Sequence, residues 1–186
     1  MPNPYSTPES DLHRDLNHGE GDITSPFSAK GRFSRYSFLA WNLLLNMAIL
    51  LIVVVIMGIT GGAASLLTVE DPNEIIAFYT SGVGLIVLAV LFISFVFTII
   101  FFIRRLHDTN MNGWWALLLV IPIVNVIFGL FVLIKRGTEG PNSYGPTRAT
   151  PTWEKVLGII ALIIIVLYFV TIITAIAMPF IVGGMQ

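Results

Sequence analysis

The sequence has no cysteine, few charged side chains and no charged side chain at all within four long stretches. The lack of cysteine excludes disulfides, thiolate metal sites and cysteine nucleophiles. Only 11% of residues are charged, whereas about 25% are charged in an average soluble domain. The charge-free stretches span residues 36–69, 75–103, 109–134 and 156–186. Each is longer than the roughly 20 apolar residues that a helix needs to cross a bilayer, so the chain is predicted to be a membrane protein.

Further absences argue against several classes of function. The ten lysine and arginine residues are scattered in ones and twos, whereas a nucleic-acid partner requires a continuous basic face, so we expect no nucleic acid to bind. The charge-free stretches hold no acidic, basic or histidine side chain of the kind that coupled transporters place inside their helices. The first thirty residues are polar and proline-containing rather than basic and then apolar, so we expect no cleavable signal.

The apolar stretches predict an all-α membrane protein. Three full transmembrane helices are expected at about residues 38–59, 75–103 and 156–182. The second has a favourable start, because Asp71 can cap the helix and Pro72 suits its first position. Gly82 and Gly84 allow close packing or a local bend within it.

The remaining apolar segment, residues 114–134, is interrupted by Pro122 and Asn125. Proline removes a backbone donor and asparagine can satisfy turn groups, so a re-entrant hairpin competes with a kinked fourth crossing. A crossing places Lys135 and every later cation outside, whereas a hairpin keeps all ten cations on one side. The positive-inside rule favours the hairpin, with the N-terminus cytoplasmic and the C-terminus periplasmic.

The composition divides the chain into three parts. Residues 1–25 carry three prolines and five acidic side chains against one arginine, which predicts a disordered acidic tail. Residues 27–147 form the membrane domain, and residues 148–186 add a linker and a C-terminal transmembrane helix.

Three asparagines within the apolar segments are expected to pack against other helices. Asn42 and Asn46 are four residues apart and therefore share one helix face. An amide in lipid is costly unless it bonds a neighbour, so this face, like Asn125, should point into the protein.

Three polar motifs follow one another between the apolar segments: Gly31–Arg35, Arg105–Thr109 leading to Gly113-Trp114-Trp115, and Gly137–Gly145. Together they resemble the bacterial inner-membrane family known as domain of unknown function 805, the YhaH-like proteins, over roughly residues 27–147. The resemblance implies a bacterial inner-membrane location and a helical fold, and it brings no established activity. Glu139 stands where the family often has proline, and Ser143 where it often has a basic residue.

The same motifs supply the candidate binding residues. Arginine forks match phosphate geometry, and the hairpin would bring all three motifs to one face, around a pocket for a phosphate-bearing headgroup. We favour a structural interpretation over this pocket, in which the arginines anchor the second helix, Asp108 caps the following segment and the glycines make turns. The candidates for lipid or partner binding are Gly31, Arg32, Arg35, Arg104, Arg105, His107, Asp108, Trp114, Trp115, Asn142 and Tyr144.

The sequence gives little indication of a catalytic, metal or cofactor site. His107 and Asp108 lack a third metal ligand, so we expect no metal, no cofactor and no catalytic residue. The leading hypothesis is a non-enzymatic protein that binds anionic phospholipid headgroups or a membrane protein partner, or that forms a homo-oligomer. The alternatives are a small oligomeric transporter or channel, and a membrane enzyme that acts on a lipid headgroup through His107 and Asp108.

Overall fold

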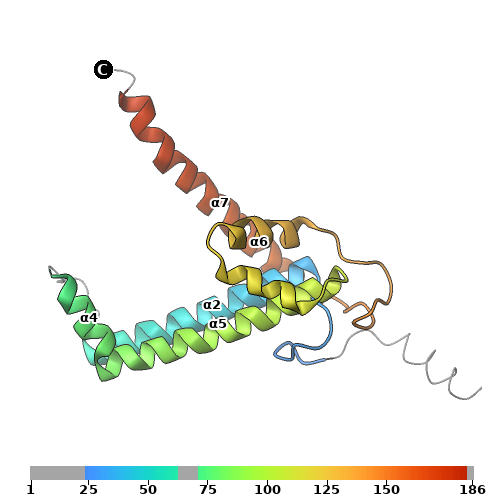
Figure 1. Cartoon of the computed structure of the whole chain (residues 1–186), viewed down its shortest axis with the longest axis horizontal. Helices are drawn as coiled ribbons and strands as arrows, with labels where there is room; N and C mark the ends of the chain where they lie inside the picture. Colours follow the sequence, from blue (N-terminus) through green and yellow to red (C-terminus); the bar gives the residue numbers. More distant parts are fainter. Residues whose placement is uncertain (1–23, 63–70, 184–186) are drawn as a thin grey trace, which may run out of the picture.

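The computed structural model describes residues 24–62 and 71–183, and every regular element within these ranges is a helix. Most of the predicted disordered tail lies outside the described residues. Helices α2 and α5 lie side by side, and α7 crosses α2 and diverges from it toward the C-terminus (Figure 1). In chain order the elements are α2 (Arg35–Thr60), α4 (Pro72–Thr80), α5 (Gly82–Asp108), the 3₁₀ helix η1 (Gly113–Val120), α6 (Val124–Ile134) and α7 (Thr152–Gly183).

Three of these helices are long and apolar enough to cross a membrane, which confirms the predicted fold class. Helix α2 begins after Ser34, whose hydroxyl accepts a hydrogen bond from the Ser37 amide, and ends at Gly61 with a φ of 70°. Glycine adopts this left-handed conformation without strain, so it stops the helix cleanly. Many large apolar side chains of the three helices are exposed, as expected for surfaces that face lipid.

The predicted second helix is divided at Ser81. Asp71 caps α4 as expected, and hydrogen bonds from Asn73 lower the pKa of its carboxyl group. The chain then leaves helical geometry at Ser81, whose hydroxyl caps α5 by accepting from the Gly84 amide at 3.1 Å. A Cβ atom on Gly84 would lie 2.1 Å from the Phe78 carbonyl oxygen, so glycine permits the tight corner. The spanning helix therefore starts at Gly82 instead of residue 75.

Helix α5 also continues further than predicted, to Asp108 instead of residue 103. Arg105 and His107 occupy its last turn, where positive charge is favourable beside the exposed carbonyl groups. The second motif is thus the helix end itself and not a loop that follows it.

The segment after α5 is a hairpin. Helices η1 and α6 pack against each other, and η1 packs on α5. At about 2.0 and 1.5 Å per residue they are each roughly 16 Å long, about half of a hydrocarbon core. The turn uses Pro122 and Ile123, and Ile123 has a φ of 71°. The Asn125 side chain donates through Nδ2 to the Leu119 carbonyl at 3.4 Å. The predicted turn residues are confirmed, and the segment does not form a fourth crossing.

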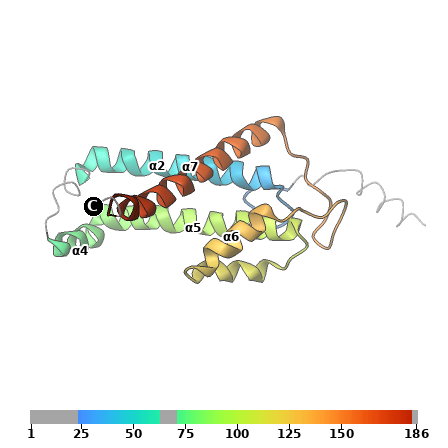
Figure 2. The ribbon, with the colours of Figure 1, turned by 90° about the horizontal axis from the view of Figure 1, so that it is seen from above.

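Both ends of the hairpin lie at the same end of α5 (Figure 2). Its start follows Asp108 directly, and its last turn returns to Arg105, which donates to the carbonyl groups of Val132 and Lys135. A small apolar core joins hairpin and helix through Phe102, Leu106, Ala116 and Val132.

Helix α7 is fastened to α2 by polar and steric contacts at its first turns. Glu154 is fully buried, and its carboxylate accepts from Arg148 at 2.7 Å and from the Trp41 indole at 2.9 Å. One turn later the two backbones touch, because a Cβ on Gly158 would lie 2.7 Å from the Tyr36 carbonyl oxygen. The C-terminal helix is therefore integrated with the membrane domain at this end.

We expect Gly158→Ala to force α7 away from α2. Overpacking of this kind costs about 1–3 kcal/mol, which corresponds to a fall in melting temperature of several degrees in a chain of this size. Thermal unfolding of the detergent-purified protein measures the effect. Gly58→Ala in α2 is the matched control, since a Cβ there meets nothing within 4 Å, and it should leave the melting temperature unchanged or raise it. Equal effects of the two substitutions would contradict the close contact.

The prediction for Asn42 and Asn46 is right about their shared face and wrong about their bonding partners. Asn42 and Asn46 share a face and line a shallow groove between α2 and α7. However, their amides donate to the carbonyl groups of Phe38 and Asn42 on their own helix, each at 2.8 Å, and neither bonds another helix among the described residues.

Candidate functional site: a buried ion cluster

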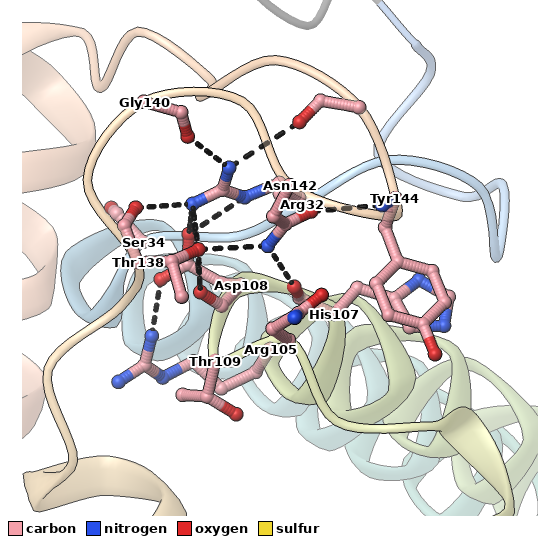
Figure 3. Close-up of polar contacts among 12 residues, drawn as sticks. Arg32, Ser34, Arg105, His107, Asp108, Thr109, Thr138, Gly140, Asn142 and Tyr144 are labelled. Atoms are coloured by element: carbon pink, nitrogen blue, oxygen red, sulfur yellow. Dashed lines mark hydrogen bonds and ion pairs between the residues drawn. The ribbon is translucent and has the colours of Figure 1, made fainter.

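Asp108 at the end of α5 holds two arginines, one on each carboxylate oxygen (Figure 3). Its Oδ1 accepts from Nε and Nη2 of Arg32 at 3.2 and 3.0 Å, and its Oδ2 accepts from Nη1 of Arg105. Both arginine side chains are fully buried. Since charge-assisted bonds of this geometry are strong and directional, they fix the position of the segment before α2 against the end of α5.

The third motif wraps around Arg32. The Arg32 guanidinium donates to the carbonyl groups of Thr138 at 2.6 Å and Gly140 at 2.7 Å, and more weakly to that of Gly145 at 3.3 Å. The planar guanidinium therefore organises a loop more than one hundred residues away in sequence. We call Arg32, Arg105, Asp108, Thr138 and Asn142 the ion cluster.

The loop is also tied directly to α5. The Thr138 amide donates to the Asp108 carbonyl at 2.8 Å, and the Asn142 side chain donates to the His107 carbonyl at 2.8 Å. Gly137 lies against the carboxylate itself, because a Cβ there would be 2.0 Å from Oδ2 of Asp108. The last carbonyl groups of α5, which the helix cannot satisfy, are in this way paired with the third motif.

His107 links the first motif to the third. Its Nδ1 lies 3.3 Å from the carbonyl oxygen of Gly31, and its ring stacks on that of Tyr144 with centroids 3.9 Å apart and planes 5° apart. The Tyr144 amide donates to the Asn142 side chain at 2.8 Å. The imidazole is thus held from both sides.

Arg104 organises the segment before α2. Its Nη1 donates to the Thr24 hydroxyl and to the carbonyl groups of Ser25 and Ser28 at 2.9–3.1 Å. The Phe33 ring lies between two guanidinium groups, 4.3 Å from that of Arg104 and 5.1 Å from that of Arg148. Residues 24 and 25, assigned by sequence to the disordered tail, belong to this ordered packing.

The structure brings together most of the residues that the motifs singled out. Gly31, Arg32, Arg104, Arg105, His107, Asp108, Asn142 and Tyr144 meet at one end of the helices. Arg35 is exposed beside this cluster, and the Trp114 and Trp115 side chains are 75% and 50% exposed on η1. Asp108 does not cap the next segment, since Asn112 does so by accepting from the Trp114 amide.

Sequence reasoning missed three contributors to this site. Thr138 lies within the third motif, so its position could have been noted. Glu154 is the sole acidic residue after the motif region, and this isolation was the available signal for a buried ion pair with Arg148. Phe33 alternates with Arg32 and Arg35 in sequence, a pattern that predicts a ring at headgroup level, but the structure buries this ring completely.

The interactions of the ion cluster are of the kind that stabilise a fold. Both carboxylate oxygens of Asp108 are engaged by arginines, so the group is not placed to take a proton from a substrate. Within the described residues, no group of three or more histidine and acidic side chains could hold a metal ion.

Charge is strongly separated along the helices. Every lysine and arginine in the described ranges lies in the cluster, in the segments that flank it or in the first turns of α2 and α7. The described acidic residues at the opposite end are Asp71 and Glu74. These features define a helical membrane protein with three helices long enough to span a bilayer, in which the hairpin and the polar segments before α2 and after α6 are held together by a buried arginine–aspartate cluster.

The chain belongs to the family described as protein of unknown function (DUF805), which matches residues 26–146. This confirms the resemblance inferred from the three motifs. Two inner membrane proteins of Escherichia coli strain K12, YhaH and YhaI, are 44% and 46% identical to the chain over 43 residues. Each alignment covers 23% of this chain and 36% of the relative, so the chain matches little more than a third of either relative's length. No solved structure matches the chain.

Proposed function

We propose that the protein is a non-enzymatic component of the bacterial inner membrane that binds anionic phospholipid headgroups on the cytoplasmic face. The separation of charge supports this best. The described lysines and arginines all lie at the end that holds the three motifs, and the two described charges at the opposite end, Asp71 and Glu74, are both acidic. Under the positive-inside rule the motif end is cytoplasmic, which also makes the N-terminus cytoplasmic and the C-terminus periplasmic.

The residues proposed to bind lipid differ from the first candidates. Arg32, Arg104 and Arg105 are fully buried and donate to protein carbonyl groups, so they shape the site and do not present charge to a headgroup. The cations with solvent-accessible side chains form what we call the cationic rim: Lys30, Arg35, Lys135, Arg136 and Lys155.

Exposed aromatic side chains beside the cationic rim support a position at headgroup level. Tyr36 and Trp153 are 40% and 44% exposed beside Arg35 and Lys155, at the first turns of α2 and α7. Tyrosine and tryptophan are enriched at the membrane–water interface, where their rings meet both lipid and water. A cation near an anionic membrane surface contributes roughly 1 kcal/mol, so several together produce a marked preference for anionic lipid.

A triple variant tests the cationic rim. In nanodiscs of equimolar phosphatidylglycerol and phosphatidylethanolamine, the parent protein should enrich phosphatidylglycerol among the lipids that co-purify with it. Lys30→Gln, Arg35→Gln and Lys155→Gln together should reduce this enrichment at least tenfold, because about 3 kcal/mol of attraction is removed. Lipid mass spectrometry provides the measurement.

The control keeps the charge. Lys30→Arg, Arg35→Lys and Lys155→Arg should retain the enrichment, and raising the salt concentration should weaken it in both the parent and this control. If the glutamine variant enriches phosphatidylglycerol as strongly as the parent at equal melting temperature, the proposal is wrong.

A further inference from the structure

Two polar side chains of α2, those of Asn42 and Asn46, take no part in the site at the motif end. Each donates one amide hydrogen to a carbonyl group of its own helix, at 2.8 Å. Among the residues that the structure describes, neither side-chain oxygen accepts a hydrogen bond, and the second amide hydrogen of each has no acceptor. An asparagine offers two donors and an acceptor, so most of this hydrogen-bonding capacity is unused.

Asn46 lies near the middle of the membrane-spanning part of α2. The helix runs from Arg35 to Thr60, and Asn46 is the twelfth of its 26 residues. About 15 Å of helix or more therefore lies on either side of it, which is half of a hydrocarbon core. Asn46 is also exposed, and a bilayer offers no water to satisfy an amide at this depth. Its side chain needs a polar partner from outside this chain.

A groove runs beside the two asparagines, between α2 and α7, with a volume of about 220 Å³. On α2 it is lined by the asparagines together with Leu39 and Leu43, at the three- and four-residue spacing that is typical of the seam between packed helices. On α7 it is lined by Ala161, Ile164 and Ile165. Helix α7 crosses α2 and then diverges from it (Figure 1), so it leaves the second asparagine uncovered.

A second copy of the chain satisfies the exposed amide in a way that lipid does not. Two copies inserted in the same orientation carry Asn46 at the same depth, where an acyl chain has no polar atom. Because asparagine both donates and accepts, two such side chains related by a two-fold axis can bond each other reciprocally. Hydrogen bonds of this kind between helices stabilise association within a membrane.

We infer that the protein forms a homodimer through α2, in which Asn46 of each copy donates to the side-chain oxygen of Asn46 in the other. Helix α2 of the second copy lies along the stripe from Leu39 to Asn46, and α7 flanks it from the opposite wall of the groove. This contact lies within the membrane-spanning helices, and it does not depend on lipid binding at the cationic rim.

Dilution in lipid tests the dimer. Copies labelled with donor and acceptor dyes at Ala29→Cys, an exposed position before α2, are mixed in phosphatidylcholine liposomes, which contain no anionic lipid. Energy transfer between parent copies should fall as lipid is added and give a dissociation constant. Asn46→Leu should raise this constant about tenfold, because two equivalent hydrogen bonds are lost at once. A parent protein that stays monomeric at every dilution overturns the inference.

Two controls separate the amide from other effects of the substitution. Asn46→Gln keeps an amide and should keep most of the association. Thr171→Leu removes a polar group from an exposed position of α7, where the hydroxyl bonds the Leu167 carbonyl of its own helix at 2.9 Å, and it should leave the constant unchanged. Asn46→Leu removes a polar group from lipid, so its melting temperature should not fall. Association of Asn46→Leu as strong as that of the parent refutes the asparagine pair.

Crosslinking tests which face of α2 meets the second copy. Leu50 and Leu51 are both 64% exposed, but Leu50 lies one turn after Asn46 on the same face, and Leu51 is turned by about 100° from Leu50. The chain has no cysteine of its own. With copper phenanthroline as the oxidant, Leu50→Cys should give a disulfide-linked dimer in liposomes and Leu51→Cys should give little. Equal yields from the two positions, or no dimer from Leu50→Cys, would show that this face is not the interface.

Discussion

Asp108→Asn should lower the melting temperature of the detergent-purified protein by roughly 10 °C, and it should do so without changing the size of the side chain. The carboxylate is the counter-charge of Arg32 and Arg105, which are both fully buried. Breaking a buried pair on one side costs about 3–5 kcal/mol, because the remaining charge is left without compensation. Here the one carboxylate pairs with two arginines.

The matched control removes a carboxylate from an exposed pair in the same region. Glu139 bonds Arg136 at 2.9 Å, but the two side chains are 82% and 79% exposed, so water and salt screen the interaction. Glu139→Gln should not change the melting temperature measurably. If Asp108→Asn is as mild as Glu139→Gln, the ion cluster does not hold the fold together.

Gly137→Ala should also destabilise the protein strongly, although it adds only one methyl group. That group would lie 2.0 Å from Oδ2 of Asp108, so either the carboxylate must leave Arg105 or the loop must move off α5. Overpacking alone costs about 1–3 kcal/mol, and weakening of the buried ion pair adds to it. The melting temperature of the purified variant measures the sum.

A double variant identifies the cause. In an Asp108→Ala background the clashing oxygen is absent, so Gly137→Ala should have much less effect than in the parent. Gly129→Ala in α6, where a Cβ meets nothing within 4 Å, should leave the melting temperature unchanged or raise it. Full additivity of the Asp108 and Gly137 effects would show that the glycine is needed for another reason.

The spans and the hairpin could be predicted from the sequence because each depends on local composition. The length of a charge-free run shows directly whether it can cross a bilayer. Pro122 and Asn125 likewise mark a turn within an apolar segment. The distribution of cations added an independent reason for the hairpin. The corner at Ser81 could be predicted only in part. Gly82 and Gly84 indicated close packing or a local bend, but their positions do not show that the helix ends there and a new one starts.

The role of the motif arginines could not be predicted for a related reason. The sequence shows that Arg32 and Asp108 are charged, but they are 76 residues apart, and their pairing arises only when the first and second motifs meet. Sequence alone does not distinguish an arginine that binds a headgroup from one that donates hydrogen bonds to protein carbonyl groups. The structure distinguishes them by burial: Arg32 is fully buried, whereas Arg35, three residues later, is exposed.

The hairpin is central to this account, because it places the three motifs and the described cations at one end of the long apolar helices. The chain has no cysteine, so single cysteines can report sidedness without background. Ala29→Cys, Glu74→Cys and Ser143→Cys introduce thiols at exposed positions before α2, in α4 and after the hairpin. With a membrane-impermeant maleimide on intact spheroplasts, only Glu74→Cys should be labelled, and Ala29→Cys and Ser143→Cys should react only after permeabilisation. Labelling of Ser143→Cys in intact spheroplasts while Ala29→Cys stays protected would contradict the hairpin.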